Sequence, residues 1–82
     1  MRKVHINHIY QHYKGDKYIV LGVGKHSETL EEHVIYRALY GDGQIWVRPM
    51  SLFIDEIDHK KHPEIKQKYR FKELHIKSVA NH

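Results

Sequence analysis

Residues 33–49 read HVIYRALYGDGQIWVRP and decide the fold of this 82-residue chain. Apolar and polar side chains alternate along the first half of the run, which predicts a β-strand with Val34 and Tyr36 on one face. The glycine-rich turn at residues 41–44 leads into a second apolar run, so the two runs form a predicted β-hairpin. Pro49 lacks an amide hydrogen for a sheet and is expected to end the second strand.

Another hairpin is predicted closer to the N-terminus. Residues 9–13 alternate in polarity, and residues 18–24 are rich in β-branched and aromatic side chains. A KGDK turn at residues 14–17 joins them. Gly22 and Gly24 fall late in the second of these strands, where they predict a bulge or a sharp bend.

The C-terminal half has shorter predicted elements. Residues 50–53 form a single turn of the 3-10 type that tucks Leu52 or Phe53 under the sheet. Pro63 favours a short helix at residues 63–69, and residues 69–76 alternate enough to be a last strand or an extended arm. About five short strands with a helical turn before the last one predict a mainly β fold of the SH3-like barrel type, and an OB-like barrel is the alternative.

Length and composition bound the organisation of the chain. Eighty-two residues suit one domain, with residues 1–8 as an N-terminal arm, residues 9–57 as the barrel core and residues 58–82 as a basic C-terminal extension. Because cysteine is absent, disulfides and thiolate metal sites are excluded. No apolar run reaches the roughly 18 residues of a membrane span, so we expect a cytoplasmic protein without a membrane partner.

The basic excess is concentrated near the C-terminus. Lysine and arginine number 14 against 10 aspartate and glutamate, a formal net charge of +4. Lysines neutralise phosphates and aromatic rings stack on bases, so this basic segment is a candidate nucleic-acid-binding arm. Its candidate residues are Lys66, Lys68, Tyr69, Arg70 and Lys72. In the alternative interpretation the lysines face water and four apolar or aromatic residues dock on the barrel: Ile65, Tyr69, Phe71 and Leu74.

The loop at His26, Ser27, Glu28 and Thr29 gathers an imidazole, two hydroxyls and a carboxylate. Loop side chains of this kind are free to contact a ligand. The alternative is a turn held together by side-chain to backbone hydrogen bonds. A hydrolytic site with His26 as general base and Glu28 orienting it is incomplete, because it lacks a positioned nucleophile and an oxyanion hole.

Aromatic residues and one arginine fall at alternate positions of the predicted hairpin at residues 33–49. Tyr36, Trp46 and Arg48 can share one face, where rings stack and a guanidinium binds phosphate or carboxylate. Tyr40 is a further candidate for this face. In the alternative interpretation the rings form the core, and Arg48 pairs with Glu28 or Asp42. Trp46 and Arg48 are the pair expected to be exposed.

Nine histidines invite a metal interpretation, but their spacing does not support one. His5 and His8 are three residues apart, as are His59 and His62, and neither pair lies in a firmly predicted helix. No metal site and no cofactor is predicted.

Several short motifs occur together in one order and resemble a known family. They are YQHYKG at residues 10–15, HSET at 26–29, Tyr36 with ALYGD at 38–42, and Arg48-Pro49 with Phe53. The stretch from residue 9 to 57 resembles domain-of-unknown-function family 1653, whose members are small bacterial proteins or modules. The resemblance implies the fold and the site region, and it implies no activity.

The function predicted from the sequence is a small non-catalytic binding module for nucleic acid or a nucleotide-like anion. Its predicted ligand patch consists of His26, Ser27, Glu28, Thr29, Tyr36, Trp46 and Arg48. A protein or peptide adaptor that uses the same aromatic groove is the first alternative, and a hydrolytic enzyme with His26 and Glu28 is the second.

Overall fold

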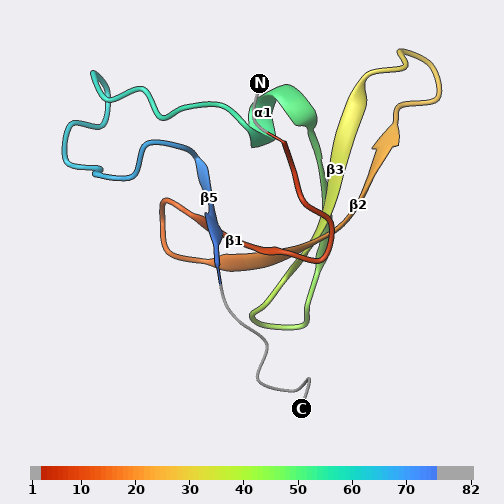
Figure 1. Ribbon diagram of the computed structural model, residues 1–82, viewed down its shortest axis with the longest axis horizontal. Coiled ribbons are helices and arrows are strands. Elements are labelled where there is room, and N and C mark those ends of the chain that lie inside the picture. The colour runs from red at the N-terminus through yellow and green to blue at the C-terminus, as the bar shows by residue number, and fades with distance from the viewer. Residues whose placement is uncertain (1–2, 76–82) are drawn as a thin grey trace.

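The computed structural model describes residues 3–75. Its elements are β1 (Ile9–His12), β2 (Lys17–Lys25), β3 (Glu32–Ala38), β4 (Ile45–Pro49), the single-turn helix α1 (Met50–Phe53) and β5 (Phe71–Leu74) (Figure 1). The mainly β prediction is therefore confirmed. The 3-10 prediction for residues 50–53 is wrong: the turn is α-helical, because the Ile54 amide donates to Met50 O at 3.0 Å. Within residues 3–75, no helix has the length and apolar character needed to cross a membrane. The end of the predicted basic extension, residues 76–82, lies outside the described residues.

The five strands form one antiparallel sheet in the order β4-β3-β2-β1-β5. β4 and β5 are its two edges, so the hydrogen-bonded sheet is open and closure into a barrel is not confirmed. These edge strands are only five and four residues long. Side chains of these two strands meet where the Arg48 guanidinium lies over the Phe71 ring.

Both predicted hairpins are present. In the first, β1 pairs with β2 and Tyr10 lies opposite Tyr18. In the second, β3 pairs with β4 and Tyr36 lies opposite Trp46. Gly43, with φ of 70°, supplies the left-handed backbone that this second turn requires.

A bulge in β2 confirms the irregularity predicted from its glycines. The β2–β3 register shifts between Val20 and Gly22. Because one extra residue is inserted, Val20 lies opposite Tyr36 and Val23 lies opposite Val34. Val20 and Val23 of β2 therefore lie on the same face of the sheet as Val34 and Tyr36, and we call this face the inner face.

The core lies against the inner face and is largely aromatic. Its buried members are Tyr10, Val20, Val34, Tyr36, Phe53 and Phe71. The rings of Phe53 and Phe71 stack with centroids 4.2 Å apart and an interplanar angle of 10°. Within α1, Phe53 is fully buried whereas Leu52 is 49% exposed, so Phe53 is the residue that the helical turn places under the sheet.

The segment between α1 and β5 differs from its prediction. Residues 63–69 contain no helix, so the helix predicted after Pro63 is wrong. Instead the chain is held against residues 55–57: the Ile57 amide donates to Lys68 O at 2.9 Å, and the Arg70 amide donates to Asp55 O at 3.1 Å. These tertiary hydrogen bonds require an extended backbone. The predicted last strand is present as β5, which pairs with β1.

Candidate functional site

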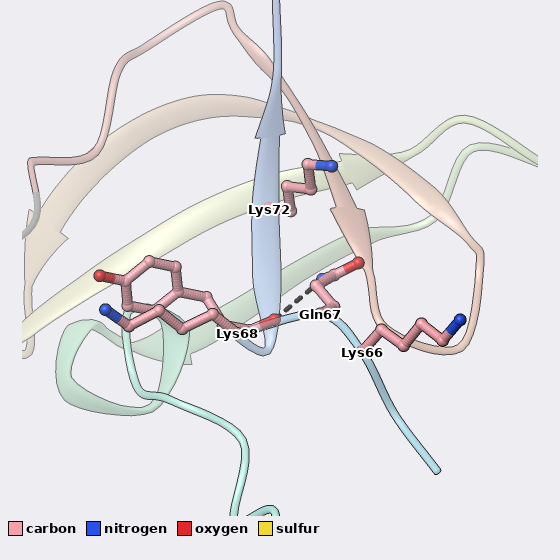
Figure 2. Close-up of a pocket in the computed structure, with 5 residues that line it drawn as sticks. Lys66, Gln67, Lys68 and Lys72 are labelled. Atoms are coloured by element: carbon pink, nitrogen blue, oxygen red, sulfur yellow. Dashed lines mark hydrogen bonds between the residues drawn. The ribbon is translucent and has the colours of Figure 1, made fainter.

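A basic hollow lies where this extended segment meets β5. Its volume is about 570 Å³. We use the name basic hollow for the surface lined by Lys66, Gln67, Lys68, Tyr69 and Lys72. Figure 2 shows Lys72 on β5 and Lys66 and Lys68 on the segment that precedes it. The Lys68 ammonium lies 5.3 Å from the centroid of the Tyr69 ring. Among the described residues, none of the three lysines is ion-paired with a carboxylate.

Gln67 fixes the backbone of the basic hollow. Its side-chain amide donates to Gln11 O on β1 at 3.1 Å and to Tyr69 O at 2.8 Å. Because this single side chain bridges β1 and the segment leading into β5, the lysines on either side of it project from a fixed backbone. Gln67 is a residue that the sequence interpretation did not single out, since its partners are distant in the chain.

Arg70, predicted as part of the nucleic-acid arm, is engaged elsewhere. Its guanidinium forms two hydrogen bonds with the Asp55 carboxylate, at 2.9 and 3.2 Å. These hydrogen bonds raise the pKa of Arg70. Arg70 therefore holds the extended segment to residue 55, whereas the other four predicted arm residues line the basic hollow.

Tyr36, Trp46 and Arg48 share the inner face, because Tyr36 lies opposite Trp46 and Val34 lies opposite Arg48. Tyr36 is buried, Arg48 is half-buried and Trp46 is 49% exposed. Arg48 Nε donates to the Tyr36 hydroxyl at 3.1 Å, and the guanidinium carbon lies 5.2 Å from the Phe71 ring centroid. Of these three residues, Trp46 has the most surface available to a ligand.

In the loop between β2 and β3, His26 organises the backbone. Its Nδ1 accepts the amide hydrogens of Glu28 and Thr29 at 3.2 and 3.3 Å. Thr29 Oγ1 in turn accepts the amide hydrogen of Glu31 at 3.2 Å. No hydrogen bond joins the His26 ring to the Glu28 carboxylate within the described part of the chain, and the His26 nitrogen that a base would use is already an acceptor of backbone amides.

The loop and the Trp46–Arg48 pair lie on different faces of the sheet. A shallow depression of about 220 Å³ places His26 with His33, Ile35 and Val47. Val47 lies opposite Ile35 and alternates with its neighbours Trp46 and Arg48, so it points to the outer face. The structure therefore does not unite the loop with Trp46 and Arg48 in a single patch.

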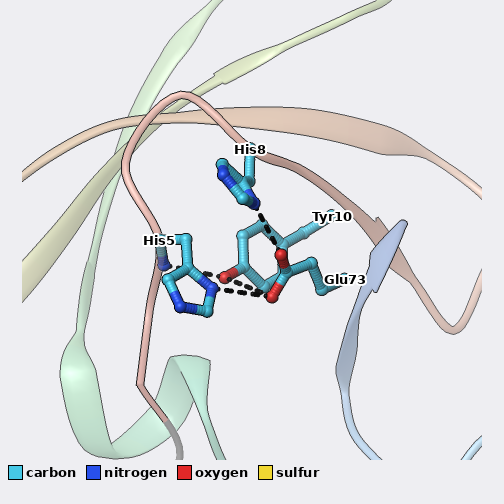
Figure 3. A network of polar contacts seen from close by, with 4 residues as sticks. All are labelled: His5, His8, Tyr10 and Glu73. Atoms are coloured by element: carbon cyan, nitrogen blue, oxygen red, sulfur yellow. Dashed lines mark hydrogen bonds and ion pairs between the residues drawn. The ribbon is translucent and has the colours of Figure 1, made fainter. Parts of the chain in front are cut away.

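A polar cluster beyond these predictions joins the N-terminal residues to β5 (Figure 3). The Nδ1 atoms of His5 and His8 lie 2.9 and 2.6 Å from the two carboxylate oxygens of Glu73. Burial raises the pKa of Glu73, but the hydrogen bonds from both histidines outweigh it and leave that pKa below its usual value. The spacing of His5 and His8 is visible in the sequence, whereas Glu73 joins them only through the pairing of β1 with β5.

The fold and these sites define a small, mainly β domain with an aromatic inner face and a basic edge. The family model described as "Protein of unknown function (DUF1653)" matches residues 8–73, and the chain belongs to this family. A crystal structure of a DUF1653 protein from Bordetella bronchiseptica is similar to it, with a TM-score of 0.69 and 26% identity over 90% of this chain and 94% of that one. A comparison with curated proteins found no match.

Proposed function

We propose that this domain binds single-stranded nucleic acid through the basic hollow. The observation that carries the proposal is that one hollow is lined by Tyr69 and by three lysines, Lys66, Lys68 and Lys72, which lack carboxylate partners in the described part of the chain. The Lys68 ammonium lies 5.3 Å from the centroid of the Tyr69 ring. Ammonium groups neutralise phosphates, and an aromatic ring beside them provides a stacking surface for a base. A volume of about 570 Å³ is that of a small-ligand site.

An extended anion fits the basic hollow better than a single phosphate does. In the view of Figure 2 the ammonium groups of Lys66 and Lys68 lie on opposite sides of β5 and do not converge. One phosphate can contact only one of them at a time. Successive phosphates of a single strand can contact both, and Tyr69 directly follows Lys68 in the sequence.

The test is a fluorescence anisotropy titration of labelled, mixed-sequence RNA and DNA single strands with the full chain. If three phosphates are neutralised, we expect the logarithm of the affinity to fall with the logarithm of the salt concentration with a slope of about −2, at roughly −0.7 per phosphate. Replacing Lys66, Lys68 and Lys72 together by alanine should abolish most of this slope.

A matched control separates the site from net charge. The control replaces three exposed lysines outside the basic hollow by alanine: Lys14, Lys17 and Lys25. This triple variant loses the same charge and should keep most of the affinity. Equal losses in the two triple variants would mean nonspecific attraction. An affinity that does not respond to salt would contradict the proposal.

We also infer an SH3-like curl of the sheet, which supports the domain as a binding module. The order β4-β3-β2-β1-β5 and the helical turn before the last strand are compatible with it. The contact between Arg48 and Phe71 across the two edge strands supports it further. Nuclear Overhauser contacts between these two side chains in solution test this arrangement, and their absence would contradict it.

Peptide binding at β4 is a second candidate function. β4 is an edge strand, and Ile45, Trp46 and Val47 are 44%, 49% and 61% exposed. An exposed apolar edge can accept an added strand from a partner. Selection from a peptide library should then recover extended apolar peptides whose binding is lost in Trp46→Ala and is insensitive to salt, and failure to recover any would count against this candidate.

A further inference from the structure

The cluster of His5, His8 and Glu73 brings together the atoms that ligate transition metals. One ring nitrogen of each histidine and one carboxylate oxygen of Glu73 all lie within 4.8 Å of one another. Tetrahedral coordination with bonds of about 2.0 to 2.2 Å requires ligand atoms about 3.3 Å apart. His5 Nδ1 lies 2.9 Å from Glu73 Oε1 and His8 Nδ1 lies 2.6 Å from Glu73 Oε2, so both ring nitrogens already face the carboxylate.

The turn that carries the two histidines is held in place before any ion binds. Asn7 adopts a left-handed φ of 68° between them. The Asn7 amide donates to Val20 O at 2.7 Å, and His8 O accepts the Val20 amide hydrogen at 3.1 Å. Asparagine tolerates this backbone conformation better than most residues. His5 and His8 are therefore presented by a turn that is anchored to β2.

Tyr10 also contacts Glu73. The two residues lie opposite each other in the pairing of β1 with β5. The Tyr10 hydroxyl lies 3.4 Å from Glu73 Oε1 and accepts the His5 amide hydrogen at 2.9 Å. A buried hydroxyl that contacts both the carboxylate and the backbone of a histidine is the kind of outer partner that fixes metal ligands (Figure 3).

We propose that His5, His8 and Glu73 form a site for a divalent transition metal of the zinc class. Two imidazole nitrogens and a carboxylate oxygen are the donors that such ions prefer. The ion binds the Nδ1 atoms that face Glu73, any hydrogen on Nδ1 leaves to solvent, and each neutral imidazole then carries its hydrogen on Nε2. Because the side chains of His5 and His8 are 44% and 50% exposed, a fourth position stays open to water or an external ligand.

Titration of the full chain, without an affinity tag, tests the site. Calorimetry with Zn²⁺ should give one ion per chain, and Co²⁺ should produce the visible absorption bands of a four-coordinate site. His8→Asn and Glu73→Gln should each weaken binding by about tenfold or more, in line with the effect of losing a metal-site group. Circular dichroism of both variants verifies that the sheet is retained.

The pair His59 and His62 provides a matched control, since it has the same spacing. The double variant H59N/H62N should keep the full affinity and the cobalt bands. Nitrogen NMR of the imidazoles should assign Zn²⁺ to Nδ1 of His5 and His8. Absence of saturable binding, loss of binding only in the control variant, or coordination by other histidines would overturn the proposal.

Discussion

The guanidinium of Arg48 lies over the ring of Phe71, with 5.2 Å between its central carbon and the ring centroid. These residues belong to β4 and β5, the two edge strands of the sheet. The two edge strands of the open sheet are therefore in side-chain contact with each other. Arg48 also donates to the Tyr36 hydroxyl at 3.1 Å, so it links three strands.

Replacing Arg48 by methionine should lower the free energy of unfolding by about 1 to 2 kcal/mol, because the Tyr36 hydroxyl loses its partner and the cation–aromatic contact is lost. Urea denaturation measures the change. Arg37→Met is the control: Arg37 is an exposed residue on the outer face of β3, and we expect a change within about 0.5 kcal/mol. Equal effects of the two substitutions would show that Arg48 does not stabilise the curl.

Phe53→Ala should destabilise the domain far more than Leu52→Ala. Phe53 is fully buried and stacks on Phe71, so its truncation should cost about 3 to 5 kcal/mol. Leu52 is 49% exposed, and its truncation should cost about 0.5 kcal/mol or less. Thermal melts followed by circular dichroism compare them, and a reversed order would contradict the orientation of α1.

His26→Ala should loosen the loop between β2 and β3 without changing nucleic-acid affinity. The amides of Glu28 and Thr29 lose their acceptor, at a cost of about 1 kcal/mol. Their hydrogen exchange should accelerate while exchange in β3 stays slow. Ser27→Ala is the control and should leave both amides unchanged. A loss of oligonucleotide binding in His26→Ala would instead return the loop to the ligand site.

His12 should make the domain less stable in mild acid. Burial lowers the pKa of His12 from its ordinary 6.5, and the positive charges of Arg48, Arg70 and Lys14 lower it further. The unfolded chain then binds a proton at a higher pH than the folded one. The resulting stability is fully present above pH 6.5 and is lost as the pH falls through the folded-state pKa.

Urea denaturation from pH 7.5 down to 5 should therefore show wild-type stability falling relative to His12→Asn. As a control, the His59→Asn variant should lose stability between pH 7.5 and pH 5 to the same extent as the wild type, because it retains His12. Proton NMR of the His12 ring gives its midpoint directly. A midpoint above 6.5 would reverse the predicted sign.

Local patterns predicted the hairpins well, because their determinants are near neighbours. Alternation fixed the faces of β3, and the left-handed glycine at residue 43 fixed the turn that follows. The glycines of β2 predicted its bulge for the same reason. In contrast, Pro63 is a local helix signal that failed, since hydrogen bonds from Ile57 and Arg70 hold the segment extended.

The predicted ligand patch combined the loop at residues 26–29 with strand residues Tyr36, Trp46 and Arg48. Alternation of polarity shows which strand residues share a face, but it does not show on which side of the sheet a loop lies. The structure keeps Trp46 and Arg48 with Tyr36 on the inner face, and it puts His26 beside Val47 on the outer face. The basic residues at 66–72 were recognisable from charge alone. Arg70 pairs with Asp55, whereas the three lysines of the basic hollow have no such partner among the described residues. This difference depends on contacts between distant segments of the chain.

The sequence by itself determined a mainly β domain with two hairpins, an aromatic core and a basic C-terminal segment, because alternation, turn glycines and charge act over a few residues. Only the tertiary structure decided that Phe71 completes the core and that Glu73 meets His5 and His8. Those contacts arise from the pairing of β1 with β5, whose partners lie about 60 residues apart in the chain, as in Tyr10 with Glu73. No local periodicity specifies such a pairing; it forms because the buried rings of both strands share one core.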